Sequence, residues 1–253
     1  MISTRLEQWK EAIRQEYDYV WAMGDCPNVE TAVTENQKFW KTVERKNGWL
    51  CQKNTVSGYA RIVSPDGIRK GNGRLSVMKE KMERLASKEF IRRGDILGVS
   101  RNGLYEHYAI YLGNGRVIHY SGENDDFNGK ITIHEAPLSE FVKDAKEYFV
   151  VWFDRGHPVR IQCSTSFVFS LNLDIRRAMH QGKYQVFSAE ETVRRARSRM
   201  GEAKYNLVTN NCEHFAMWCK TGEAVSGQVE QVLNAGKKRQ IMPVAYDFWS
   251  KTI

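Results

Sequence analysis

The side chain best suited to covalent chemistry is the thiol of Cys212, within the stretch NNCEHF at residues 210–215. Residues 205–208 predict a short extended segment before it, and the mostly apolar residues 215–219 predict a buried helix after it. A cysteine at such a helix start lies beside unpaired backbone N–H groups and the positive end of the helix dipole. We expect this setting to favour the thiolate, the nucleophilic form of cysteine, and the N–H of Cys212 to stabilise an oxyanion.

A cysteine nucleophile needs an imidazole within hydrogen-bond reach, and a third polar group that orients this base. His107 opens a predicted strand at 107–112, and His119 lies near the end of the returning strand at 116–120. Their separation of twelve residues is even, so on an extended chain both would share a face, although the intervening turn weakens this parity. The sequence therefore predicts two histidines that face Cys212 from a rigid sheet.

The elements that must position these residues indicate an α+β chain built on an antiparallel sheet. Asn102-Gly103 is a hairpin signal, and Ser188 followed by Glu191 fits a capping box. Residues 155–187 have no readable pattern. Apolar spacing predicts helices over 5–22, 30–46, 75–90, 138–144, 188–200 and 224–235, and strands within 49–63 and over 96–99, 107–112, 116–120, 130–134 and 148–153.

The chain carries a basic excess. Its 253 residues include 38 basic and 30 acidic side chains, a net charge of +8, which favours anionic membrane surfaces or nucleic acid as partners. No nucleic-acid motif accompanies the charge, so we expect no nucleic-acid partner. The N-terminus lacks the apolar run of a signal peptide, and no apolar run is long enough for a transmembrane helix. We therefore expect a cytoplasmic protein with peripheral contact to an anionic membrane surface.

The cysteines at 26, 51, 163, 212 and 219 form no CxxC pair, which argues against zinc-ribbon and thioredoxin-like sites. A zinc site made of His107, His119, Cys212 and His214 is disfavoured because none of the usual short ligand spacings is present. The remaining candidates are interpreted as structural. We expect Cys219 to pack in the core, His214 to make a structural hydrogen bond and Asn211 to form a turn. Tyr111 and Tyr120 are expected to line the wall of the site or pack in the core.

Three blocks of the sequence resemble the lecithin:retinol acyltransferase-like family. The segment HYAIYLGNGRVIH at 107–119, preceded by Gly94-Asp95-Ile96, is similar to the family's histidine segment, and NCEHF at 211–215 is similar to its nucleophile motif. The stretch TGEAVSGQV at 221–229 resembles the family's continuation. We therefore divide the chain into three segments. Residues 1–90 form an N-terminal extension that is mostly helical and of unknown role, residues 91–236 form the catalytic domain, and residues 237–253 form a C-terminal tail.

The resemblance implies a circularly permuted papain-like fold of the NlpC type, with the antiparallel sheet packed on the cysteine helix. It implies that Cys212 attacks a phospholipid acyl ester and carries the acyl group as a thioester. In the same scheme His107 acts as general base and then acid, and His119 supports its ring. Transfer of the acyl group to water gives phospholipase A activity, and transfer to an alcohol or amine gives acyltransferase activity. No metal and no organic cofactor is implied.

Two other functions fit the same residues. A thiol peptidase or amidase would use the same cysteine and histidines on a different carbonyl substrate. A catalytically silent binding module would keep the fold and hold Cys212 as an inert buried thiol.

Overall fold

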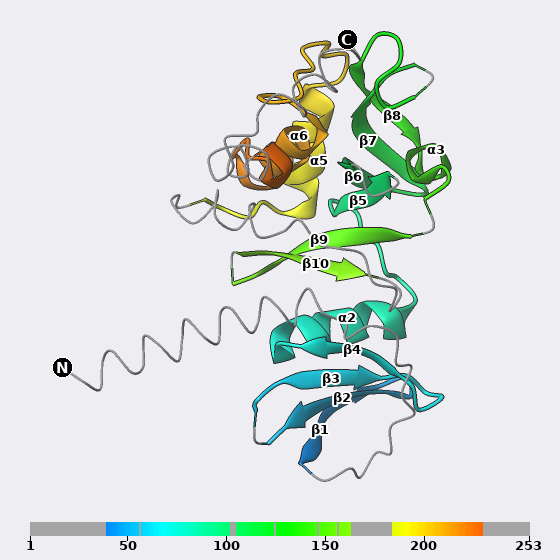
Figure 1. The fold of residues 1–253 in the computed structure, drawn as a ribbon, viewed down its shortest axis with the longest axis vertical. Coiled ribbons are helices and arrows are strands. Elements are labelled where there is room, and N and C mark those ends of the chain that lie inside the picture. Colours follow the sequence, from blue (N-terminus) through cyan, green and yellow to red (C-terminus); the bar gives the residue numbers. More distant parts are fainter. Residues whose placement is uncertain are drawn as a thin grey trace, which may run out of the picture.

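A computed structural model describes residues 39–229 apart from 56, 102–104, 124, 146, 156 and 163–183. The described residues form two antiparallel sheets, with strand orders β1-β2-β3-β4 and β10-β9-β5-β6-β7-β8, and four helices (Figure 1). The predicted α+β class with antiparallel sheets is confirmed. The elements are β1 Trp40–Lys46, β2 Trp49–Asn54, β3 Ala60–Val63, β4 Arg69–Gly73, α2 Leu75–Ser87, β5 Ile96–Arg101, β6 Tyr105–Gly113, β7 Arg116–Ser121, β8 Thr132–Pro137, α3 Leu138–Val142, β9 Tyr148–Asp154, β10 His157–Gln162, α5 Ala189–Ser198 and α6 Cys212–Thr221.

The first sheet begins with a strand where the sequence predicted a helix. Residues 40–46 form β1, so the helix predicted over 30–46 is wrong in its described part. Asn47 and Gly48 both adopt positive φ, 46° and 82°, as a tight hairpin turn between β1 and β2 requires. Exposure alternates along β1, which is the period of a strand with one covered face. The described part of residues 1–90 is therefore a four-stranded sheet with one helix, rather than a mostly helical unit.

Helix α2 joins this small sheet to the large one. It packs on β2 and β3 and also contacts β10 (Figure 1). One continuous hydrophobic cluster runs from Ile62 and Met82 to Leu97 and Val150 on the large sheet. The buried guanidinium of Arg84 donates to the carboxylate of Asp95 at 2.7 Å across the same junction. The small sheet and one face of the large sheet thus share a core.

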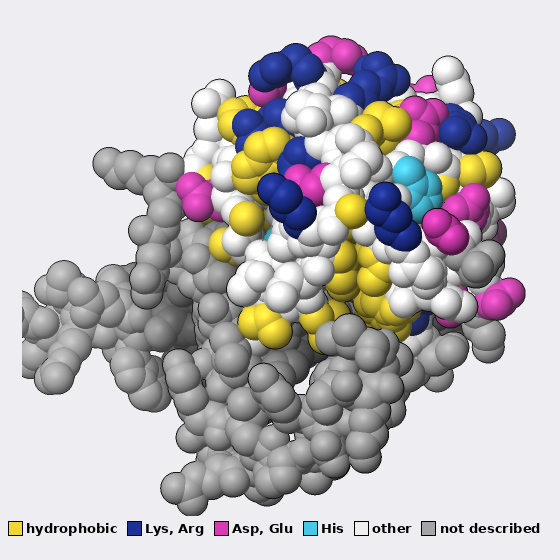
Figure 2. All heavy atoms as spheres, turned by 90° about the horizontal axis from the view of Figure 1, so that it is seen from above, with side chains coloured by type: hydrophobic (Ala, Val, Ile, Leu, Met, Phe, Trp, Pro, Cys, Tyr) yellow, Lys and Arg dark blue, Asp and Glu magenta, His cyan; other side chains and the backbone are white. Residues whose placement is uncertain are grey.

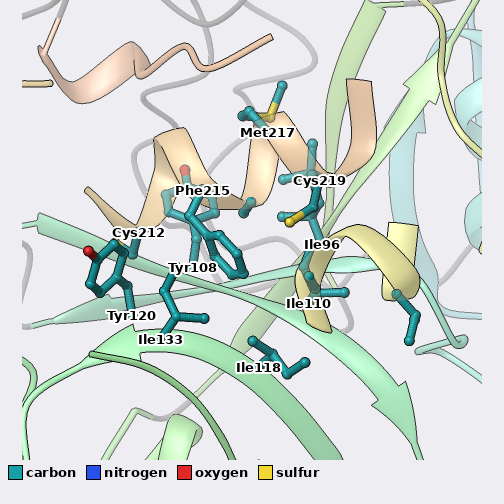
Figure 3. Close-up of a cluster of buried hydrophobic side chains, with 14 of the residues drawn as sticks. Ile96, Tyr108, Ile110, Ile118, Tyr120, Ile133, Cys212, Phe215, Met217 and Cys219 are labelled. Atoms are coloured by element: carbon teal, nitrogen blue, oxygen red, sulfur yellow. The ribbon is translucent and has the colours of Figure 1, made fainter. Parts of the chain in front are cut away.

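Helices α5 and α6 cover the opposite face of the large sheet. Tyr108 and Ile110 of β6 and Ile118 of β7 meet Phe215 and Met217 of α6 in a second cluster (Figure 3). The hydroxyl of Ser188 accepts from the N–H of Glu191 at 3.3 Å, which confirms the predicted cap of α5. The predicted packing of the sheet on the cysteine helix is confirmed.

The remaining predictions have mixed outcomes. Strand β10 occupies part of the range 155–187, where the sequence has no readable pattern. In the range 224–235, residues 224–226 have no regular structure and residues 227–229 are helical. The helix predicted at 5–22 and the tail at 237–253 lie outside the described residues. Within the described ranges, every helix is too short or too polar to cross a membrane.

Candidate active site

Cys212 is the first residue of α6, as its sequence context predicts. The side chain of Asn211 accepts hydrogen bonds from the N–H groups of Glu213 and His214, both at 3.0 Å. In return, His214 Nδ1 accepts from the N–H of Asn211 at 3.4 Å. This reciprocal cap uses the N–H groups of residues 213 and 214, whereas the N–H of Cys212 makes no hydrogen bond to any described residue. The cap confirms the predicted structural hydrogen bond of His214, and it shows that Asn211 is the N-cap residue of α6.

The thiol of Cys212 is buried and neutral. Its side chain is 3% exposed, and its Sγ atom lies 3.9 Å from the carbonyl oxygen of Glu106. Burial raises the pKa of Cys212 to about 12, and the nearby carboxylate of Glu213 acts in the same direction. The thiolate expected from the helix terminus is therefore a wrong prediction for the resting site. The backbone N–H groups of Tyr108 and Glu213 oppose this rise in pKa, but the loss of hydration at the buried sulfur outweighs them.

His107 and His119 form a buried imidazole pair on adjacent strands. His107 Nε2 lies 3.0 Å from His119 Nδ1, and both side chains are at most 1% exposed. His119 pairs with Ala109 in the β6–β7 register, so His107 lies two residues further along on the same face. Phe141 of α3 packs on both rings. The parity argument for a shared face is confirmed.

The cysteine and the imidazoles approach β6 from different sides. Tyr108 of β6 lies in the cluster that contains Cys212, whereas the His107 ring packs on Phe141, which belongs to the opposite cluster. No hydrogen bond joins Cys212 Sγ to either imidazole among the described residues. The direct contact that the sequence analysis expected is therefore not formed in this conformation. Hydrogen bonds of this kind often tighten only when substrate is bound.

The edge of β6 beside His107 faces α6 and is not paired with β7 in the described register. The last β6–β7 pair toward this end is Ala109 with His119. Beyond it, the side chain of Gln228 takes the place of a strand, accepting from the N–H of Glu106 at 2.8 Å and donating to its carbonyl at 3.0 Å. Cys212 Sγ meets the same carbonyl. The sulfur of Cys212 therefore contacts the backbone of the residue directly before His107.

Asp126 is a site residue that the sequence analysis missed. Its Oδ1 lies 3.8 Å from His107 Nε2, and its side chain is 1% exposed. It accepts from Arg101 Nε at 2.7 Å and from the hydroxyl of Tyr105 at 2.8 Å. Burial alone would raise the pKa of Asp126, but His107, Arg101 and Tyr105 outweigh it and hold the pKa below its usual range. Asp126 is thus a fixed negative charge beside the imidazole pair.

Both imidazoles are neutral at rest. Burial lowers the pKa of His107 to about 4, Asp126 opposes this shift, and Arg101 adds to it. Burial also lowers the pKa of His119, to well below its ordinary value, and the neighbouring His107 adds to this effect. The site therefore holds a thiol and two uncharged rings, with Asp126 placed to stabilise an imidazolium once a proton arrives.

A second buried network anchors the start of α6. Glu213 Oε2 accepts from the Ser226 hydroxyl at 2.5 Å and from Gln228 Nε2 at 3.3 Å. Burial raises the pKa of Glu213 to about 7, against the hydrogen bond from Ser226. The side chain of Glu106 accepts from Tyr108 Oη at 2.5 Å and pairs with Arg160. Sequence reasoning missed Glu213 and Gln228 as site residues, although both lie inside blocks that it singled out.

The other candidates are structural in the described geometry. Cys219 is a free, fully buried cysteine of the α6 cluster. Tyr120 packs edge-on against Phe215, and the hydroxyl of Tyr111 accepts from the N–H of Gly115 at 3.1 Å. The four residues considered for zinc are not brought together. Among the described residues, His119 instead lies at metal-ligand spacing from two other side chains, those of His134 and Glu140.

A cysteine at a helix start and a buried imidazole pair beside a carboxylate are the residue types that thiol-dependent acyl transfer requires. The model of the family described as lecithin retinol acyltransferase matches residues 89–225. The chain belongs to this family.

Several relatives are similar over somewhat more than half of the chain. Lecithin retinol acyltransferase of Rattus norvegicus is 30% identical over 139 residues, which is 55% of this chain and 58% of the relative. Phospholipase A and acyltransferase 1 of Homo sapiens is 30% identical over 142 residues, 56% of this chain and 74% of the relative. Phospholipase A and acyltransferase 5 of Homo sapiens is 30% identical over 149 residues, 58% of this chain and 46% of the relative. The chain thus spans somewhat more than half the length of the first of these relatives.

Proposed function

We propose that this protein is a cysteine-dependent acyltransferase and phospholipase A that acts on phospholipid acyl esters. The names of the relatives indicate an enzyme of acyl transfer and phospholipid hydrolysis. The single structural observation that supports the proposal is the position of Cys212. Its sulfur and its unused N–H lie at the first turn of α6, beside the strand that carries His107.

In the first half-reaction, His107 takes the thiol proton of Cys212 as the sulfur attacks the ester carbonyl. His107 Nε2 already faces His119 Nδ1, so Nδ1 is the ring nitrogen that accepts this proton. The free N–H of Cys212 donates to the oxyanion of the tetrahedral intermediate. The ester C–O bond then breaks, and the imidazolium gives its proton to the departing lysophospholipid oxygen. The acyl group remains on Cys212 as a thioester.

In the second half-reaction, water or an acceptor hydroxyl or amine attacks the thioester. His107 removes the acceptor's proton, and the expelled sulfur recovers a proton from the imidazolium. Asp126, 3.8 Å from the ring, stabilises the positive charge that the imidazole carries in both steps. His119 holds the ring of His107 in place through its 3.0 Å contact.

The experiment that tests the proposal is intact-mass measurement after incubation with a defined phospholipid. We expect a mass increase equal to one acyl chain on the wild type, its removal by neutral hydroxylamine, and no increase in Cys212→Ala. His107→Asn should slow adduct formation by about a hundredfold or more. A wild-type adduct that maps to another residue would contradict the proposal.

Two alternatives give different results in the same assay. A thiol peptidase or amidase would form its adduct with a peptide or amide substrate and not with the phospholipid. A catalytically silent module would form none, and the buried, neutral thiol without an imidazole contact is the observation that favours it. Covalent capture of the acyl chain therefore separates all three functions.

We further propose peripheral contact with an anionic membrane surface, which the net charge of +8 supports. The end of the molecule in Figure 2 carries Lys and Arg side chains interspersed with Asp and Glu, without a single-sign patch. Co-sedimentation with vesicles of neutral and anionic phospholipid tests this contact. Equal binding to both vesicle types would contradict it.

A further inference from the structure

The β7–β8 hairpin and the first turn of α3 bring together two histidines and a carboxylate. His119 of β7 lies directly opposite His134 of β8 in the strand register, so both side chains project from one face. Glu140 of α3 follows six residues after His134. One possible ligand atom from each of the three residues lies within 4.8 Å of the others. His134 Nε2 and Glu140 Oε1 are 4.0 Å apart.

An independent observation points to a ligand at this position. His119 is fully buried, and its Nε2 atom has no hydrogen-bond partner among the residues that the structure describes. A buried ring nitrogen without a partner is costly. The other ring nitrogen of His119 already faces His107. A metal ion bound to Nε2 would satisfy the remaining one.

His134 is held in the ring form that binds metal. Its Nδ1 atom lies 3.1 Å from the carbonyl oxygen of Thr132, which is nearer than the hydroxyl of the same residue at 3.4 Å. A carbonyl oxygen can only accept, so Nδ1 carries the proton and Nε2 keeps its lone pair. A histidine ligand whose second nitrogen donates to a backbone carbonyl is the usual arrangement at protein-bound zinc. The lone pair belongs to the nitrogen that lies nearest Glu140.

We propose that His119, His134 and Glu140 bind a divalent transition-metal ion, zinc in particular. Two imidazoles and one carboxylate are a common three-residue zinc set, with water as the fourth ligand. Tetrahedral bonds of about 2.1 Å place ligand atoms about 3.4 Å apart, so a contraction from 4.8 Å is needed. The Glu140 side chain, half exposed, and that of His134, one third exposed, have room to move. They also leave the ion a path from solvent, since β8 is the edge strand of the sheet.

Metal binding would prevent His107 from acting as the general base. This consequence rests on the proposed function. Coordination through Nε2 leaves the His119 proton on Nδ1, which then donates to His107 Nε2 at 3.0 Å. The single proton of neutral His107 must then lie on Nδ1. That nitrogen can no longer accept the thiol proton of Cys212. Zinc at this site therefore inhibits acyl transfer without contacting the cysteine.

Calorimetric titration of the full chain with zinc tests the site itself. We expect one ion per chain, and affinity losses of about tenfold or more in His134→Asn and in Glu140→Gln. His157→Asn is the matched control, because His157 lies on β10 at the opposite edge of the same sheet. This control should bind zinc as the wild type does. Cobalt(II) should show the visible absorption of a low-coordinate site in the wild type and lose it in both ligand variants.

Unchanged zinc affinity in His134→Asn and Glu140→Gln would overturn the proposal. Melting curves in chelator show whether each variant is folded, and Glu140→Gln changes a half-exposed side chain. Inhibition is measured separately, as the rate of acyl-adduct formation with and without zinc, and should be relieved in Glu140→Gln relative to its own metal-free rate. Absence of any adduct in chelator counts against the proposed function alone, because zinc binding is measured without turnover.

Discussion

The sulfur of Cys212 lies 3.9 Å from the carbonyl oxygen of Glu106, the residue immediately before His107. The nucleophile and the proposed base thus approach the same strand segment from two sides, and among the described residues the side chain of Gln228 pairs with the strand edge between them. The proton transfer in the proposed mechanism needs a turn of the Cys212 or His107 side chain across this edge. In the described geometry, the thiol therefore has no imidazole in contact with it.

Alkylation of Cys212 should be slow and strongly dependent on pH. Because burial raises the pKa of this thiol to about 12, the thiolate fraction of the folded protein rises about tenfold per pH unit through the neutral range. The rate of iodoacetamide labelling, followed by peptide mass analysis, should increase from pH 6 to 9 without a plateau. The urea-unfolded chain should level off near the ordinary cysteine pKa of about 8.5. A plateau below pH 8 in the folded protein would show that the thiolate is stabilised after all.

Asp126→Asn should slow acyl-adduct formation. Removal of an opposite charge 3.8 Å from His107 lowers the pKa of an imidazole by about 1–3 units, so the protonated base is harder to form and the rate falls by about tenfold or more. Asp125→Asn is the matched control, because it makes the same charge change on a side chain that is 71% exposed. Equal slowing in both variants would remove Asp126 from the mechanism.

Asn211→Ala should destabilise the protein by about 1–2 kcal/mol through loss of the α6 cap. The substitution removes the acceptor of two N–H groups at 3.0 Å and the donor to the Leu207 carbonyl at 2.9 Å. Ser188→Ala at the cap of α5 removes one longer bond of 3.3 Å and should cost less. Urea unfolding of both variants checks the order, and an equal or larger loss in Ser188→Ala would contradict it.

Glu213→Gln should remove a pH dependence of stability. Burial raises the pKa of folded Glu213 from 4.5 to about 7, so the folded state holds a proton that the unfolded state has released. Its contribution is complete below pH 4.5 and is lost as the pH rises toward 7. The free energy of unfolding of the variant, minus that of the wild type, should therefore increase by roughly 2–3 kcal/mol between pH 5 and pH 8.

Urea unfolding at these two pH values measures this difference, and groups other than residue 213 cancel in the subtraction. A difference that stays constant with pH would mean that Glu213 has an ordinary pKa in the folded protein.

Local sequence signals predicted the parts of the site that depend on short-range geometry. The polar turn ahead of an apolar run predicted that Cys212 begins a helix, and the even separation of His107 and His119 predicted their shared face. The strand β1 was missed because its apolar residues also fit a helical period. The Asn47-Gly48 dipeptide, a hairpin signal directly after these residues, favours the strand over the helix.

The missed features depend on contacts between distant segments. Asp126 reaches His107 only because the chain after β7 folds back over Arg101 and Tyr105. The raised pKa of Cys212 comes from the packing of α6 on β6, and a helix start read from sequence gives the favourable dipole without this burial. The circular permutation of a papain-like fold and the division into three segments stay predictions.

The core shared by the two sheets limits how far the enzyme can be truncated from its N-terminus. The family match starts at residue 89, and a shortened chain could begin there. Leu97 and Val150, however, are packed in one cluster with Ile62 and Met82 from the preceding segment. A chain beginning at residue 89 would expose to water the apolar face of the large sheet, which carries His107. We expect such a fragment to aggregate, so enzymological work should retain the first sheet and α2.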